Sequence, residues 1–567
     1  MRIAKIIPAI VAVLACTALR AQDDSVMKAM RDEMARSMSQ LTIENLQKPY
    51  YISYRVEDSE SYNANASFGA LNNTGSGHSR MLAVEVRVGD YKFDNSGFFS
   101  FNFDGGTTMM MGIGGTQLPL DDDYKEMRRQ IWLATDAAYK RAVENYSKKK
   151  ASLENKTRPD ETPDFSKETP AVTTDIWPVP AIDQTKLEAE ARAVSALFRQ
   201  MPGIETSHVA INADTIYTRY LNSEGTSFTR RLPSIGININ AATQASDGSA
   251  LNDFVWYHGR AVADLPPQDK LEARAKELGG YLTALRGAPA LANYNGPVLA
   301  EGNAAAQLIR LVFLPSLIGS RPVMRDMPNG MVAPNAPAEN AFLDKVNARV
   351  MPEFLSITDN PLITDYQGFK LQGGSKVDED GVPSREVKLV ENGYLKSLLT
   401  TRDPVRGFEQ STGSRHVGQP TPTNLIVSST NTMSNEDLRA KLLAIVNQRH
   451  LEFGIIIRRL RNANTPVLTY KVFPDGHEEL VRNMQFNGMN AAAFKDILAT
   501  SKDLNVLTVE YRPQNNQFAF LSMPEESYRP VTIVSPSLLF EDMNLRRIRA
   551  AAPNPPVATH PFFDKDK

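Results

Sequence analysis

The histidines are the first residues to test for chemistry in this sequence, because a zinc-peptidase helix needs two imidazoles on one face. A carboxylate must also stand beside the metal to activate water. No two histidines lie within one helical turn, since they occupy positions 78, 208, 258, 416, 450, 477 and 560. The best superficial match, His477-Glu478-Glu479, has no second histidine and follows the hairpin-turn sequence Pro474-Asp475-Gly476. We therefore expect no conventional zinc-peptidase site.

Patterns for serine and phosphate chemistry are also incomplete. No G-x-S-x-G elbow is present, and Ser25-Val26-Met27-Lys28 has S-x-x-K spacing without its partner motifs. The glycines of 105–115 bracket a methionine triplet but lack phosphate-loop spacing, so they predict a loop that could act as a lid. Asp121-Asp122-Asp123 fits the amino-terminal charge of a helix better than a metal site. We predict no catalytic residue and no metal ligand.

Composition narrows the function classes further. Cys16 is the only cysteine, so a chain cleaved after Ala21 would have no thiolate for catalysis or metal binding. The formal net charge of −2 and the absence of a dense basic stripe predict no nucleic-acid binding. With 567 residues, the chain is long enough for two or three cores.

The amino terminus has the layout of a secretory signal peptide. Arg2 and Lys5 precede an apolar run over 6–19, and Ala21 is the expected cleavage site. Because no later segment is long and apolar enough to span a bilayer, we expect an exported protein, periplasmic or extracellular, without a transmembrane segment. The alternative is a lipoprotein, since Val13-Leu14-Ala15-Cys16 loosely resembles a lipidation box.

The elements that must position any site follow from hydrophobic periodicity. Helices are expected over 23–41, 121–145, 187–200, 268–286 and 435–448, and strands over 50–56, 82–88, 209–211, 216–221, 235–240 and 254–262. Ser434 with Asp437 predicts a capping box for the last helix. Asn392-Gly393 and Asp475-Gly476 predict hairpin turns. The expected fold class is α+β, with helices flanking large antiparallel sheets.

Changes in composition divide the chain into six segments. They are a signal peptide (1–21), an amino-terminal α+β extension (22–147), a linker rich in proline and charge that lies over the surface (148–184), an α+β domain (185–290), a β-rich carboxy-terminal domain (291–550) and a tail (551–567).

Three stretches resemble the TldD/PmbA family, metallopeptidase-related proteins once described as modulators of DNA gyrase. They are Asn295–Gly302 with the apolar run Ala304–Leu314, the D-E-D-G-x-P-x-R hairpin Val377–Arg385 with Leu389–Leu395, and Ser411–Arg415 with Pro420–Asn424. The resemblance covers about 185–550 and implies a multi-domain α+β architecture. The segment 22–147 is similar to the amino-terminal extension of exported relatives.

The resemblance also implies where a zinc site would lie. In the zinc-bearing branch, the apolar run is a helix with H-E-x-x-x-H, and a later cysteine completes the site. Here Arg310, Leu311 and Pro315 stand at the histidine, glutamate and histidine positions, and no cysteine follows. Arginine has no lone pair with which to bind a metal. These three positions are the candidate cleft residues, and we expect no zinc.

Three functions remain open at this stage. The leading one is a non-catalytic subunit, a pseudoenzyme like the family's PmbA (TldE) branch, that binds peptide and takes part in proteolysis as a homodimer or as a heterodimer with a zinc-bearing, TldD-like paralogue. The second is an active peptidase or other hydrolase with an unconventional site. The third is a structural or carrier protein of the envelope that retains only the fold.

Overall fold

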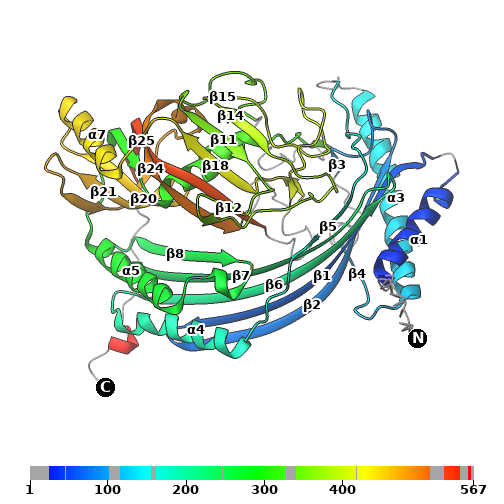
Figure 1. Ribbon diagram of the computed structural model, residues 1–567, viewed down its shortest axis with the longest axis horizontal. Coiled ribbons are helices and arrows are strands. Elements are labelled where there is room, and N and C mark those ends of the chain that lie inside the picture. Colours follow the sequence, from blue (N-terminus) through cyan, green and yellow to red (C-terminus); the bar gives the residue numbers. More distant parts are fainter. Residues whose placement is uncertain are drawn as a thin grey trace, which may run out of the picture.

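A computed structural model describes residues 24–44, 46–100, 115–154, 161–245, 247–326, 340–416, 418–510, 529–548 and 560–563. It has the predicted α+β class, with helices flanking two large sheets (Figure 1). No helix within these residues is long and apolar enough to cross a membrane. The signal-peptide positions Cys16 and Ala21 and most of the glycine-rich loop lie outside the described ranges.

The first sheet has seven strands in the order β4-β2-β1-β6-β7-β5, with β8 also paired to β7. The strands are β1 (Pro49–Ser67), β2 (Ala70–Val88), β4 (Thr116–Gln117), β5 (Val172–Ile176), β6 (Thr206–Asn222), β7 (Ser227–Gln244) and β8 (Ala250–Gly259). All neighbours are antiparallel except β5 and β7. Phe68 and Gly69, both at positive φ, turn β1 into β2, as a two-residue hairpin requires.

Alternation along β1 separates the two faces of this sheet. Tyr54 and Val56 belong to one core with α1 (Ser25–Gln40) and α3 (Tyr124–Glu154). Tyr62 and Ala64, with the same parity, belong to a second core with α4 (Gln184–Ala196), the short helix η1 (Leu197–Gln200) and α5 (Gln268–Gly287). The two helical pairs thus cover the two ends of one face, and the opposite face lies toward the carboxy-terminal domain (Figure 1).

The second sheet has twelve strands and forms the carboxy-terminal domain, with the main order β15-β14-β11-β18-β25-β9-β20-β21-β22. It comprises β9 (Tyr294–Ala300), β11 (Leu355–Asp359), β14 (Val387–Glu391), β15 (Tyr394–Leu395), β18 (Asn424–Ser429), β19 (Thr432–Met433), β20 (Gly454–Asn462), β21 (Thr465–Val472), β22 (Glu478–Val481), β23 (Met484–Phe486), β24 (Ile497–Glu510) and β25 (Pro530–Arg547). Most pairs are antiparallel, but β9–β20, β18–β25 and β19–β24 are parallel.

Helices cover both faces of this second sheet. On one face lie α6 (Asn303–Leu308) with its continuations η3 (Ile309–Phe313) and η4 (Leu314–Leu317), and η5 (Ala491–Asp496). On the other lies α7 (Asn435–Gln448). The remaining short elements are η2 (Val262–Asp264), η6 (Pro561–Phe563) and the small two-stranded pairs β3 (Phe98–Ser100) with β10 (Met324–Asp326), β12 (Asp365–Tyr366) with β13 (Phe369–Lys370), and β16 (Arg415–His416) with β17 (Gln419–Pro420).

Local signals predicted most element positions. Asp123 Oδ1 accepts the Glu126 N–H at 2.9 Å, so the acidic triplet does lie at the start of α3. Ser434 Oγ accepts the Asp437 N–H at 3.0 Å, as expected for a helix cap. His477 lies at a turn directly before β22, which confirms a hairpin and not a metal-binding helix.

The segment predicted as a surface linker differs from that expectation. Helix α3 continues to Glu154, and 172–176 forms β5 beside β7. Asp164, Phe165 and Ser166 are all buried. Proline and charge indicated a segment without helix at the surface. The segment around Asp164 instead runs between the two sheets, where its polar groups form hydrogen bonds and ion pairs with buried residues.

Candidate functional site

The helix at the expected zinc positions is irregular. After α6, the backbone widens into a π-helical turn over Ile309–Phe313, in which the Leu314 N–H donates to the Ile309 carbonyl. It then tightens into η4, near whose start Pro315 lies. Proline has no N–H with which to continue an α-helical ladder, which accounts for a change of helical type at this point. Such π-turns are frequent at functional sites.

An apolar groove lies beside this irregular helix. It has a volume of about 460 Å³, and its walls come from the end of the zinc-position helix, the loop around Phe342 and the start of η5. We call it the apolar groove; its lining includes Leu311, Val312, Pro315, Phe342, Met489 and Ala491. Of the three candidate cleft residues, Leu311 and Pro315 therefore meet in one groove, while Arg310 is partly buried and is not among its lining residues.

The chemistry of the groove does not suit a zinc ion. Leucine and proline side chains have no lone pair, and zinc needs imidazole, thiolate or carboxylate ligands. Across the described residues, no three His, Cys, Asp or Glu side chains gather closely enough to hold a metal. Two exposed lysines, Lys345 and Lys495, contribute to the lining, so this is an apolar surface with positive charge beside it.

The second region of interest is the acidic hairpin, Val377–Arg385. Asp378 organises it, because its Oδ1 accepts the N–H groups of Asp380 and Val382, each at 2.9 Å. Burial and the neighbouring Asp380 carboxyl raise the pKa of Asp378. Gly381 has φ of +78°, and a Cβ there would lie 2.4 Å from the Thr226 side chain. The hairpin tip therefore packs tightly on the turn between β6 and β7.

The acidic hairpin also carries ion pairs. Glu379 lies 3.4 Å from Arg55 on β1, and Asp380 lies 3.3 Å from Arg415. Burial alone would raise the pKa of Glu379, but Arg55 and Arg529 outweigh it and lower that pKa to about 2. A polar cavity of about 340 Å³ lies between hairpin and sheet, lined by Arg55, Glu379, Asp380, Arg415, Glu85, Arg141 and Tyr220, among others.

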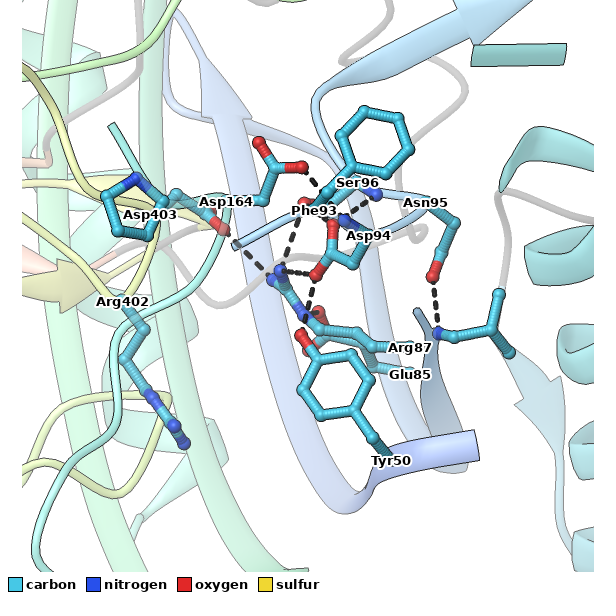
Figure 2. Close-up of polar contacts among 12 residues, drawn as sticks. Tyr50, Glu85, Arg87, Phe93, Asp94, Asn95, Ser96, Asp164, Arg402 and Asp403 are labelled. Atoms are coloured by element: carbon cyan, nitrogen blue, oxygen red, sulfur yellow. Dashed lines mark hydrogen bonds and ion pairs between the residues drawn. The ribbon is translucent and has the colours of Figure 1, made fainter. Parts of the chain in front are cut away.

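Further ion pairs hold the segment around Asp164 between the two sheets. Figure 2 shows Arg87 with Asp94 on one side, at 3.0 Å, and Asp403 on the other, at 2.9 Å. The Asp164 carboxylate accepts the Asp94 N–H at 2.9 Å and pairs with the buried Lys149 at 2.6 Å.

Arg402, which is 1% exposed, completes this set of contacts. It pairs with Glu224 at 2.7 Å and donates to the Ser166 carbonyl at 2.6 Å, and its guanidinium lies 3.9 Å from the Phe165 ring centre. We call this set of contacts, together with those of the acidic hairpin, the polar junction. Its charged members include Arg55, Arg87, Glu224, Glu379, Asp380, Arg402, Asp403 and Arg415. Sequence reasoning singled out the hairpin but not Arg402.

Two of the three family-like stretches meet at the junction. The third stretch packs on the second, since the Arg415 N–H donates to Asp378 Oδ2 at 3.1 Å and a Cβ at Gly413 would lie 2.5 Å from the Pro383 carbonyl. The first stretch instead forms β9, separated from β18 by β25. The stretches that resemble the family thus form part of the second sheet and the acidic hairpin of this chain.

Comparison with known proteins identifies a family domain in the same part of the chain as these stretches. Residues 295–547 match the PmbA/TldA metallopeptidase C-terminal domain. No curated protein matches the sequence at a significant level.

Solved structures cover nearly the whole chain. TldE from Thermococcus kodakarensis is 13% identical, with a TM-score of 0.57 over 91% of this chain and 100% of its own. A protein of Thermotoga maritima described as a modulator of a DNA gyrase is 14% identical, with a TM-score of 0.56 over 91% and 99%. One of Bacteroides thetaiotaomicron with a similar description is 10% identical, with a TM-score of 0.54 over 92% and 98%. The chain thus contains a PmbA/TldA metallopeptidase C-terminal domain at 295–547 and has the fold of these solved structures.

Proposed function

We propose that this chain is the non-catalytic subunit of a TldD/PmbA-type peptidase, paired outside the cytoplasm with a paralogue that carries the zinc. The observation that carries the proposal is the apolar groove. Its wall contains Leu311 and Pro315. By the resemblance, these positions correspond to the glutamate and the second histidine of the zinc-bearing branch. A wall of carbon cannot activate water, but it can bind an apolar segment of peptide.

The groove also suggests which peptides bind. Lys345 and Lys495 contribute positive charge beside the apolar wall. An extended peptide with an apolar side chain flanked by a carboxylate would suit both features. In this proposal the chain holds such a peptide while the paralogue's zinc site cleaves it, and the expected signal peptide at 1–21 accounts for export of the subunit.

Co-purification tests the pairing. The tagged full-length chain is expressed with an H-E-x-x-x-H-bearing paralogue from the same source and isolated from the envelope fraction. We expect a complex of the two chains that cleaves unstructured peptides, while the chain alone cleaves none. Hydrolysis by the chain alone, or failure of the paralogue to co-purify, would contradict the proposal.

A charge placed in the groove tests the peptide site within that complex. Leu311→Lys puts an ammonium group on the apolar wall, so turnover of an apolar peptide should fall by about tenfold or more, which corresponds to about 1.4 kcal/mol. Leu362→Lys is the matched control, because Leu362 is 57% exposed and lies outside the groove. Equal turnover by the two variants would contradict a role for the groove.

A further inference from the structure

Three arginine side chains line one small cavity between the two sheets. Arg230 lies on β7, Arg260 directly follows β8, and Arg529 directly precedes β25. The cavity has a volume of about 40 Å³. Arg230 is 3% exposed and Arg529 is 7% exposed, so at least two of the guanidiniums are almost completely withdrawn from water.

Two of these guanidiniums are held in position by carbonyl groups of the carboxy-terminal domain. Arg230 Nη1 donates to the Val377 carbonyl at 3.1 Å. Arg260 Nη2 donates to the carbonyls of Gln372 and Gly374 at 3.1 and 3.0 Å, and its guanidinium lies 3.5 Å from the ring centre of Trp177. These contacts fix the side chains but do not balance their charge.

Each arginine keeps a buried donor without a partner. These atoms are Arg230 Nε, Arg260 Nη1 and Arg529 Nη2. None of the three side chains forms an ion pair with any carboxylate in the part of the chain that the structure describes. Native proteins seldom leave a buried charge unpaired, because nothing then compensates for its loss of hydration.

The electrostatics agree with a missing negative charge. Burial, with repulsion from Arg529, lowers the pKa of Arg230 to about 9, even though Glu379 and Glu57 act in the opposite direction. Burial also lowers the pKa of Arg260 to about 10, although Asp175 and Asp264 act in the opposite direction. Water molecules could accept the free N–H groups, but they would not offset the repulsion between Arg230 and Arg529.

We propose that this cavity binds one small oxyanion, a carboxylate or phosphate group, shared by Arg230, Arg260 and Arg529. Guanidinium groups recognise such oxyanions through paired N–H donors. One water molecule needs roughly 10–15 Å³ of cavity volume. The cavity of about 40 Å³ therefore suits a group of about three or four heavy atoms. The anion would join the first sheet to the carboxy-terminal domain. This inference does not depend on the proposed pairing with a paralogue.

Thermal unfolding of the full chain with added anions tests the site. Sodium acetate, phosphate or citrate replaces sodium chloride at constant ionic strength in a zwitterionic buffer. We expect acetate or phosphate to raise the midpoint by about 1–3 °C and to saturate, and citrate, which is too large, to give no saturable rise. Whichever of acetate and phosphate gives the larger rise shows whether the site prefers a carboxylate or a phosphate group. Absence of a saturable rise with both would overturn the proposal.

Neutral variants separate this site from general salt effects. Arg529→Gln and Arg230→Gln should each lose the saturable rise, whereas Arg129→Gln, which changes an exposed arginine, should keep it. In chloride alone, the two site variants should unfold no earlier than the parent chain, because glutamine removes a repelling charge. A rise retained by both site variants, or early unfolding of both in chloride, would overturn the proposal.

Discussion

The apolar groove and the polar junction differ in where each places its charges. The groove is walled mainly by carbon, and the charged residues in its lining, Lys345 and Lys495, are exposed. The junction buries most of its charges, including Arg402 at 1% exposure and Glu379 at 8%, although the Asp403 side chain is 40% exposed. The family's zinc-bearing branch is expected to place its reactive groups at the groove position, whereas this chain concentrates its ionic groups where two sheets meet. The buried charges of the junction connect the first sheet to the carboxy-terminal domain.

This difference predicts how the two regions respond to substitution. A buried ion pair that loses one member leaves the other without a partner, which costs far more than loss of an exposed pair. Changes at the groove surface should alter binding and leave folding intact. The predictions below test that contrast, beginning with the largest expected effect.

Arg402→Ala should give the largest loss of stability. The substitution removes the cation paired with Glu224 and the donor to the Ser166 carbonyl, and it leaves a space against Phe165. The free energy of unfolding should fall by about 3–5 kcal/mol, as is typical for breaking a buried pair. Urea unfolding at neutral pH, followed by far-UV circular dichroism, measures the change in midpoint.

Arg406→Ala is the matched control, four residues further along the chain. Its partner Asp344 is 73% exposed and Arg406 itself is 53% exposed, so the midpoint should hardly move. If the two variants unfold at the same urea concentration, the junction does not hold the sheets together and the contrast with the groove fails.

His416 gives the junction a pH dependence. Burial, with the nearby Arg529 and Arg230, lowers the pKa of His416 well below its usual value of 6.5, although Glu379 opposes this. The imidazole therefore stays neutral in the folded chain but gains a proton in the unfolded chain below about pH 6.5. Its contribution to stability is complete above that pH and is lost as pH falls, by up to about 1.4 kcal/mol per pH unit.

His416→Gln should therefore make stability less sensitive to acid. Urea midpoints collected from pH 7.5 to 4.5 should show a slope smaller by about one proton, whatever the variant's stability at neutral pH. His208→Gln, at an exposed position on β6, is the matched control. Identical slopes for His416→Gln and the parent chain would show that this imidazole does not titrate on unfolding.

Sequence patterns predicted the helices and tight turns well because those signals are local. The β-strand lengths were underestimated: β1 and β2 have 19 residues each, and their polar distal parts, such as Asn72–Ser79, lack apolar alternation. The contacts of the polar junction could not be predicted, since Arg87 and Asp403 lie 316 positions apart. The apolar groove was located only through the resemblance, which marked Leu311 and Pro315.

The smallest expected effect is at the groove, where restoring the family motif should restore no catalysis. Arg310→His, Leu311→Glu and Pro315→His together supply H-E-x-x-x-H. The site would still lack its third ligand, because the only cysteine, Cys16, lies in the expected signal peptide. Groups that orient the imidazoles would also be missing, and these typically matter by about 10–100-fold.

The backbone adds a second obstacle for this triple variant. Leu311 and Pro315 line the groove but Arg310 does not, so the two new histidines would not both face it while the π-turn persists. We expect weak zinc binding in competition with a chelator and no measurable peptide hydrolysis. Pro315→Ala alone is the control that reports whether the helix regularises. Zinc-dependent hydrolysis by the triple variant would mean that the backbone of the groove has kept a catalytic shape. The groove would then lack catalysis only because of the side chains at these three positions.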